Sequence, residues 1–213
     1  MKGIFVSGSG TDVGKTYVAL RLIKILNNSH TVKARKPIES DCTMSLSGLT
    51  PKDATLLAEA CNSKEPAEKV CSFRFEGCSS PEKASEEEGA KITLDMLVSA
   101  CQTQEESDYV VVEGAGGLYS PIAHRSLNID LVKELKLPIV LVVRDELGAI
   151  NQALLVVEAA KKQETVVAVI VLNQKIPNNL DNKKAIERYT DVPVVVLNNR
   201  DLEGFDAKVR ELI

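Results

Sequence analysis

The residues near the start of the chain have the types and spacing of a phosphate-binding loop. The run Gly8-Ser9-Gly10-Thr11-Asp12-Val13-Gly14-Lys15-Thr16 follows an apolar stretch and opens a helical pattern. In that context backbone N–H groups and a helix N-terminus face the phosphates, a lysine adds formal charge, and a hydroxyl can bind magnesium. The first glycine stands one residue earlier than the strict pattern requires, and a glycine-rich turn needs no ligand. Gly14-Lys15-Thr16 at this place nevertheless predicts nucleoside triphosphate binding.

Two further charged residues end predicted strands. Lys36 ends the strand expected at 31–36, and Glu113 ends the strand expected at 108–113 and precedes a glycine-rich turn. Ligands of open parallel sheets bind beyond the carboxyl ends of the strands, so both side chains are expected beside the phosphate loop. An acid at the position of Glu113 is where such proteins hold magnesium, although it could instead satisfy the turn backbone. A lysine such as Lys36 could equally be a solvated surface group.

Asp53 has two interpretations that the sequence does not separate. Thr50-Pro51-Lys52-Asp53 has the pattern of a helix start, with Thr50 as the N-cap and an acid in the first turn. That local role explains Asp53 without any metal ion. A role as a magnesium ligand is equally compatible with its position.

The elements that must position these residues alternate along the chain. Strands are predicted at 2–7, 31–36, 108–113, 138–143, 166–172 and 193–197, and helices at 14–28, 52–62, 93–106, 148–163, 179–190 and 201–211. Continuous apolar runs such as 139–143 are typical of parallel strands buried on both faces. We therefore expect an α/β fold with one P-loop NTPase-like domain over residues 1–213, in which helices flank both faces of a mostly parallel central sheet. Residues 66–89 interrupt the rhythm, with a short strand at 70–75 and an acidic run, 86–88, interpreted as a solvated helix face.

Composition narrows the range of partners. The 213 residues include 26 Lys and Arg against 30 Asp and Glu, a net charge of −4, and no segment is strongly basic, which disfavours nucleic acid. There is no apolar run of membrane-spanning length, and the apolar start is too short for a signal peptide, so we expect a cytoplasmic protein without a membrane partner. The five cysteines form no C-x-x-C pair and are expected to be reduced thiols.

Four segments together resemble the dethiobiotin synthetase family. They are Gly10-Thr11-Asp12-Val13-Gly14-Lys15-Thr16, Lys36-Pro37-Ile38-Glu39-Ser40, Val112-Glu113-Gly114-Ala115-Gly116-Gly117-Leu118 and Leu147-Gly148-Ala149-Ile150-Asn151. The resemblance follows the family's order and spacing over about residues 3 to 175. It implies an ATP- and Mg²⁺-dependent enzyme that joins CO2 to 7,8-diaminopelargonic acid through a carbamate and a carbamic-phosphoric anhydride. Such chemistry needs concentrated positive charge, because carbamate and triphosphate are both anionic.

The resemblance also implies roles for individual residues. The catalytic group would be Thr11, Lys15, Lys36 and Ser40, and the magnesium ligands Thr16, Asp53 and Glu113. Nucleotide contacts would come from Asp12, Val13, Gly14, Lys15, Thr16, Tyr17 and Asn173. Substrate contacts would come from Asp12, Ser40, Ser80, Pro81, Gly116, Gly117 and Asn151, with Asn151 reaching across a homodimer.

Two segments depart from the family pattern. Asp12 stands where glutamate is usual, so its carboxylate is one methylene closer to the backbone. Asn198-Asn199-Arg200 replaces a Gly-x-Ile-Pro-like turn that would lie against the base, which leaves selectivity for ATP over other triphosphates open.

Two related classes are weaker alternatives. An amidation-type synthetase that acts on another small acid would carry a glutamine-hydrolysing domain, for which 213 residues leave no room. A partition-type ATPase switch would place an extra lysine near the start of the loop, where this chain has Gly8 and Ser9. Such switches also use amphipathic membrane tails, whereas residues 201–213 are short and mixed in charge.

Overall fold

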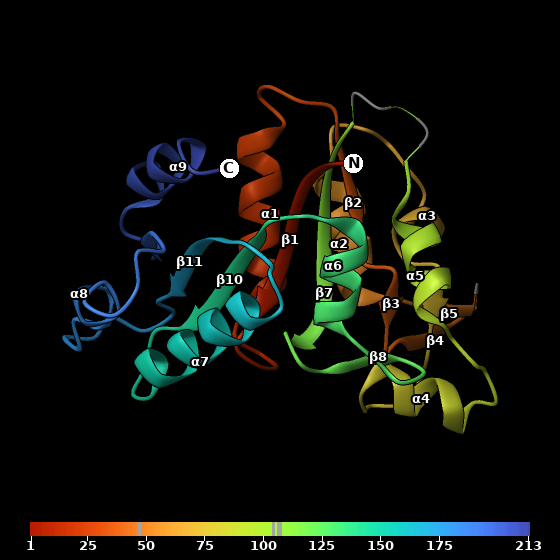
Figure 1. The fold of residues 1–213 in the computed structure, drawn as a ribbon. Helices are drawn as coiled ribbons and strands as arrows, with labels where there is room; N and C mark the ends of the chain where they lie inside the picture. Colours follow the sequence, from red (N-terminus) through yellow and green to blue (C-terminus); the bar gives the residue numbers. More distant parts are fainter. Residues whose placement is uncertain (47, 104, 106–107) are drawn as a thin grey trace.

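The computed structural model describes residues 1–46, 48–103, 105 and 108–213, and its centre is a six-stranded sheet of order β12-β11-β10-β1-β7-β2 (Figure 1). The strands are β1 (Lys2–Gly8), β2 (Val32–Arg35), β7 (Tyr109–Gly117), β10 (Ile139–Arg144), β11 (Val167–Asn173) and β12 (Val194–Leu197). Every neighbouring pair in this sheet is parallel. All six predicted strands and the predicted parallel α/β class are confirmed.

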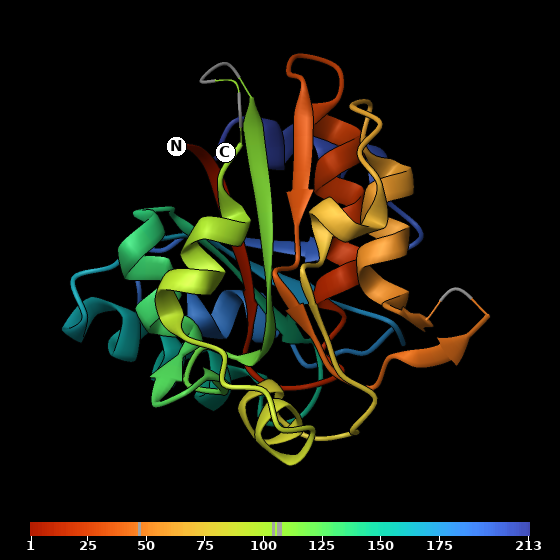
Figure 2. The same ribbon diagram turned by 90° about the vertical axis from the view of Figure 1, so that its right-hand side faces the viewer.

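Helices cover both faces of the sheet, as the apolar strand patterns predict (Figures 1 and 2). Alternate strand residues point to opposite faces, so Phe5 belongs to one core cluster, whereas Ile4 and Val6 belong to the other. The Phe5 side packs against α4 (Pro81–Glu87), α5 (Leu94–Cys101), α6 (Asn128–Leu135), α7 (Ala149–Lys162) and α8 (Asn182–Ile186). The opposite side packs against α1 (Lys15–Leu26), α2 (Lys52–Ala60), α3 (Ala67–Val70) and α9 (Leu202–Arg210).

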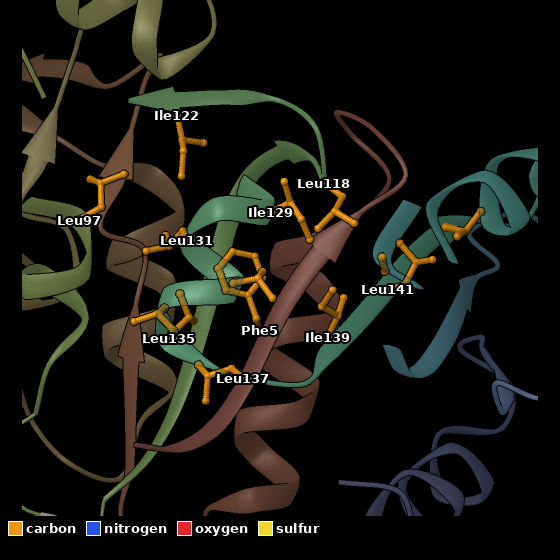
Figure 3. Close-up of a cluster of buried hydrophobic side chains, with 14 of the residues drawn as sticks. Phe5, Leu97, Leu118, Ile122, Ile129, Leu131, Leu135, Leu137, Ile139 and Leu141 are labelled. Atoms are coloured by element: carbon orange, nitrogen blue, oxygen red, sulfur yellow. The ribbon is translucent and has the colours of Figure 1, made fainter. Parts of the chain in front are cut away.

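The core on the Phe5 side includes a helix that the sequence patterns did not predict. Figure 3 shows Phe5 among aliphatic side chains that include Ile129, Leu131 and Leu135 of α6. Burying an aliphatic side chain of this size contributes about 1.5–3 kcal/mol, so α6 is a substantial part of the fold. α6 is only two turns long, and the hairpin of β8 (Pro121–Ala123) and β9 (Ser126–Leu127) directly precedes it. The helical spacing of apolar residues therefore extends over too few positions to be recognised in the sequence.

All six predicted helices are present, and two of them are much shorter than predicted. The helix predicted at 179–190 is reduced to α8, because only a narrow strip of it is buried while Leu180 and Tyr189 are exposed. The helix predicted at 93–106 corresponds to α5, and Gln102 is already extended. Positions 104 and 106 of that prediction lie outside the described residues.

Smaller elements gather at the edge of the sheet where the parallel strands end. β3 (Ile38–Glu39) pairs with β6 (Phe73–Arg74), which lies within the short strand predicted at 70–75. β4 (Thr43–Ser45) and β5 (Gly48–Thr50) form a hairpin before α2. In Figure 1 the phosphate loop, α4 and β8 lie at the lower edge, and both termini lie at the upper one. Loops distant in sequence therefore meet at one edge.

Two sequence expectations concern the surface. Glu86, Glu87 and Glu88 are exposed, as predicted, and Glu88 also accepts hydrogen bonds from the N–H groups of Glu76 and Gly77. Among the described residues, no helix has the length and apolar character needed to cross a membrane.

Candidate active site

The phosphate loop connects β1 to α1 through backbone conformations that turn N–H groups inward. Asp12 and Gly14 have φ values of 58° and 96°, in the left-handed region. A Cβ on Gly14 would lie 2.0 Å from Nδ2 of Asn173, so both the conformation and the space require glycine. Lys15 Nζ donates to the carbonyl of Gly10 at 3.1 Å. The loop is shaped to receive phosphate oxygens.

The charge state of Lys15 depends on what lies beside it. Burial, followed by the charge of Lys36, lowers the pKa of Lys15 below the ordinary lysine value of 10.5. An anion next to the amine would relieve both effects, because it stabilises the protonated form. The loop therefore favours an anionic ligand electrostatically as well as sterically.

Lys36, Asp53, Glu113 and Thr16 form a compact cluster below the loop. Lys36 Nζ lies 2.6 Å from Glu113 Oε1 and 3.1 Å from Asp53 Oδ2, and the Thr16 hydroxyl donates to Glu113 Oε1 at 2.9 Å. Burial opposes the charge on Lys36, but the carboxylates of Glu113, Asp53 and Glu39 together outweigh it and raise the pKa of the amine. The structure thus brings together the charged residues selected from the strand ends.

Glu113 has the features of a metal ligand. Its carboxylate contacts the side chains of Thr16 and Lys36, not the turn backbone, and its Oε2 is buried without a hydrogen-bond partner among the described residues. An unsatisfied buried carboxylate oxygen is costly unless something binds it. Hydroxyl and carboxylate oxygens are the ligands that Mg²⁺ prefers, so Thr16, Asp53 and Glu113 fit this ion.

The start of α2 differs from the sequence expectation. The predicted N-cap, Thr50, donates its hydroxyl to Ser45, and Pro51 stands at the cap position without a side-chain bond. Glu39 caps the helix instead, since its two carboxylate oxygens accept from the N–H groups of Asp53 at 2.9 Å and Ala54 at 3.0 Å. The prediction of Thr50 as the N-cap is wrong, because a charged acceptor from β3 supplies the cap bonds, whereas Asp53 does lie in the first turn of α2 as the sequence pattern indicated. The carboxylate of Asp53 is left to pair with Lys36.

A cavity of about 690 Å³ opens beside the cluster, within the size range of small-molecule sites. The predicted residues in its lining are Thr11, Asp12, Gly14, Lys15, Thr16, Lys36, Ser40, Asp53, Ser80, Pro81 and Gly116. Residues not selected from the sequence also line it, and they include Glu39, Asp41, Cys78, Ser120 and Lys175. Of the lining residues not selected, Glu39 and Ala115 stand within segments that resemble the family, whereas the others enter through loop packing.

Some predicted residues lie outside the cavity lining. Asn173 is buried and donates its amide to the carbonyl of Val13 at 2.8 Å, which ties β11 to the phosphate loop. Tyr17 is exposed and donates its hydroxyl to Asn199 at 2.7 Å. Asn151 is exposed in the first turn of α7 and does not line the cavity within one copy of the chain.

The Gly116-Gly117 pair is divided between two roles. The N–H of Gly117 donates to the Ser120 hydroxyl at 2.8 Å, and a Cβ at this position would lie 3.4 Å from the backbone nitrogen of Gly10. Gly117 therefore allows the end of β7 to pack against the phosphate loop. Gly116 is the member of the pair that lines the cavity.

Serine and cysteine side chains complete the opposite wall of the cavity. Ser40 donates its hydroxyl proton to the carbonyl of Ser79 at 2.7 Å, so its oxygen is left as an acceptor. Cys78 is exposed beside it, whereas the other four cysteines are buried. All five are free thiols, as expected from their spacing.

Solved structures with a similar fold have little sequence identity to this chain. Solved structures of a putative plasmid partition protein from Borrelia burgdorferi (TM-score 0.57, 12% identity, 99% of this chain and 96% of that one) and a ParA family ATPase from Chlorobium tepidum (TM-score 0.54, 13% identity, 98% and 90%) are similar. At such low identity they show the fold alone.

Sequence similarity is much closer to one group of enzymes. A family model described as an AAA domain matches residues 2–199. ATP-dependent dethiobiotin synthetases from Ruthia magnifica subsp. Calyptogena magnifica (51% identity, 100% of this chain and 99% of the relative) and Clostridium botulinum strain Eklund 17B (32%, 99% and 96%) match throughout. The chain belongs to the family of ATP-dependent dethiobiotin synthetases.

Proposed function

We propose that the chain, as one ligase domain over residues 1–213, uses MgATP to join CO2 to 7,8-diaminopelargonic acid and close the ring of dethiobiotin. The observation that carries this proposal is the Lys36–Glu113–Asp53 cluster beside Lys15 of the phosphate loop, in which Lys36 and Glu113 are buried. Two amines next to the cavity can bring an anionic carbamate and a triphosphate together. The 51% identity to a dethiobiotin synthetase over the full chain supports the same reaction.

The reaction proceeds in three steps. One amine of the substrate adds to CO2, and loss of a proton gives the carbamate. A carbamate oxygen then attacks the γ-phosphorus of ATP, and ADP leaves as the carbamic-phosphoric anhydride forms. The second amine attacks the carbonyl carbon, loses a proton and expels inorganic phosphate, which closes the five-membered urea ring.

The positively charged residues have distinct roles in this scheme. The phosphate loop, with backbone N–H groups at Asp12, Val13 and Gly14, would bind the triphosphate, and Lys15 would neutralise its terminal phosphates. The amine of Lys36 carries three N–H donors, so it can keep both carboxylates and still direct one N–H at the carbamate or phosphoryl oxygens. Thr16, Asp53 and Glu113 would hold Mg²⁺, which supplies further charge neutralisation at the phosphates.

Polar groups around the cavity suit the diamine. The Ser40 oxygen is an acceptor toward the cavity, because its proton is committed to Ser79, and it can receive an N–H of the substrate. The exposed carboxylate of Asp12 lines the same cavity and can pair with a substrate ammonium group. Thr11 would bind the carbamate or phosphate, and Ser80, Pro81 and Gly116 would contact the rest of the substrate.

We further propose a homodimer in which Asn151 completes the site of the partner subunit. Asn151 is exposed at the start of α7, and Leu147 and Leu155 nearby are 88% and 63% exposed. A contiguous patch of exposed apolar side chains is typical of an interface, and Leu147 and Leu155 would contribute to such a patch. We also assign Tyr17 and Asn173 to nucleotide binding. We place the enzyme in the cytoplasm, without nucleic-acid or membrane partners, in keeping with its net charge of −4.

The test is whether phosphate release depends on the diamine. Purified protein is incubated with MgATP and bicarbonate, with or without 7,8-diaminopelargonic acid, and phosphate and product mass are followed together. We expect phosphate in step with a product heavier than the diamine by CO2 minus water. A folded protein that binds ATP but releases no diamine-dependent phosphate would refute the proposal. Hydrolysis stimulated by DNA or vesicles instead would favour an ATPase switch.

A further inference from the structure

We infer that Glu39 is a positioning residue whose carboxylate caps α2 from a distance and thereby holds Asp53 in the metal site. The inference rests on the proposed function only in taking Asp53 as a magnesium ligand. It concerns a residue that contacts no reacting atom in the scheme above. Its effect would pass through the backbone of α2 to the Asp53 carboxylate.

The contacts of Glu39 are unusual for a helix cap. The side chain comes from β3, not from the residue preceding the helix, and it is only 5% exposed. Each carboxylate oxygen accepts one N–H, from Asp53 at 2.9 Å and from Ala54 at 3.0 Å. Bonds between an anion and the first N–H groups of a helix are favoured by the helix dipole as well as by hydrogen bonding.

Nothing local replaces this cap in the described structure. Pro51 at the N-cap position has no side-chain bond to the helix, and the Thr50 hydroxyl is donated to Ser45. Glu39 itself is held in place, because its carbonyl accepts from Phe75 at 3.0 Å and β3 pairs with β6. The first turn of α2 is therefore anchored to β3 through this one carboxylate.

Asp53 is the residue that the anchor places. Its side chain is 40% exposed and its Oδ2 lies 3.1 Å from Lys36. At this exposure the carboxylate is positioned by its ion pair with Lys36 and by its own backbone. The N–H that Glu39 binds belongs to Asp53 itself, which links the cap directly to the carboxylate that faces Lys36.

The replacement Glu39→Gln tests this link with little change in volume. A glutamine oxygen can accept one of the two N–H groups, but its NH2 group must face the other and repel it. The first turn of α2 should then shift, and Asp53 should bind metal less well. Changes in residues that orient metal ligands typically reduce affinity by about 10- to 100-fold. Glu39→Asp keeps the charge but is one methylene shorter, so its loss should be smaller.

The decisive measurement is a double-mutant cycle on Mn²⁺ binding. Electron paramagnetic resonance titration with Mn²⁺ and ADP is applied to wild type, Glu39→Gln, Asp53→Asn and the double variant. If Glu39 acts through Asp53, Glu39→Gln alone weakens Mn²⁺ binding by about 10-fold or more, but adds nothing once Asp53 is replaced. Asp201→Asn, which removes a capping carboxylate from the N–H of Gly204 in α9, is the matched control and should leave Mn²⁺ binding unchanged.

Other outcomes would overturn the inference. Wild-type affinity in folded Glu39→Gln, additive losses in the double variant, or no Mn²⁺ binding by wild type would each do so. If Glu39→Gln fails to fold by circular dichroism, Glu39→Asp is carried through the same cycle and judged by the same criterion. Failure of the proposed function is separate, since wild type would then bind Mn²⁺ and ADP but form no dethiobiotin.

Discussion

The two sides of the cavity are built by different means. On the phosphate side, one continuous segment, residues 8–16, uses backbone conformation and a single lysine. On the opposite side, Lys36, Glu39, Asp53 and Glu113 come from separate segments. Lys36 pairs with the carboxylates of Asp53 and Glu113, and Glu39 binds the backbone N–H groups of Asp53 and Ala54. The first arrangement depends on local geometry, whereas the second depends on the balance of charges in a buried place. Single substitutions on the two sides should therefore have different effects on stability and on nucleotide affinity.

The largest expected difference is in stability, when each lysine is replaced by methionine. Lys36→Met leaves Glu113 and Asp53 without their cation, and breaking a buried pair in this way costs about 3–5 kcal/mol. Among the described residues, the one hydrogen-bond partner of Lys15 is a carbonyl oxygen, and burial disfavours its charge, so Lys15→Met should leave stability unchanged or slightly higher. Urea unfolding without nucleotide measures the free energy of unfolding of both variants. Equal losses of stability for the two variants would contradict the expected difference between the two sides.

The next effect concerns the backbone of the phosphate side. Gly14→Ala places a methyl group 2.0 Å from Asn173 Nδ2 in a left-handed conformation, so the loop must change shape. Nucleotide affinity should fall about 100-fold, since charge-assisted hydrogen bonds from the loop N–H groups contribute about 1.5–3 kcal/mol each. Binding is measured by calorimetry with ADP and Mg²⁺. Gly10→Ala, whose methyl group meets no protein atom within 4 Å, is the control for folding and should keep the wild-type melting temperature.

The contrast also explains which parts could be predicted from the sequence. Phosphate-loop residues are contiguous, so their order alone predicts the conformation of the loop. The strands of the central sheet can be recognised in the sequence as runs of β-branched apolar residues. Glu39 could not be recognised as the cap of α2, because that role requires β3 to lie against a helix fourteen positions away in sequence. The same limit hid α6, whose short amphipathic pattern gains meaning only beside Phe5. Ser120 likewise meets Gly117 only after β7 has turned.

The charge on the phosphate side should also respond to pH in a characteristic direction. Because burial lowers the pKa of Lys15, its protonated form costs stability in the folded state, and that cost disappears as pH rises through the lowered pKa toward 10.5. The stability of wild type should therefore rise relative to Lys15→Met over this alkaline window, by about 1.4 kcal/mol for each unit of lowering. ADP affinity should fall over the same window as the amine loses its charge. Lys36, whose pKa is raised, stays protonated throughout.

The smallest expected effect is on the rate at which the Cys78 thiol is alkylated in the presence of each ligand. Cys78 is exposed on the substrate wall, whereas burial raises the pKa of Cys61 to about 11 and those of Cys71 and Cys101 to about 12. Since the thiolate is the reactive form, iodoacetamide at pH 8 should alkylate Cys78 first. Because Cys78 lines the cavity with Ser80 and Pro81, which we propose contact the substrate, 7,8-diaminopelargonic acid should slow this alkylation severalfold, whereas ADP alone should change it little. Mass spectrometry of the labelled peptides measures the rates, with Cys78→Ser as the control. Equal protection by ADP would mean that the nucleotide reaches the Ser79–Pro81 wall, and the division of the cavity into a phosphate side and a substrate side would then be wrong.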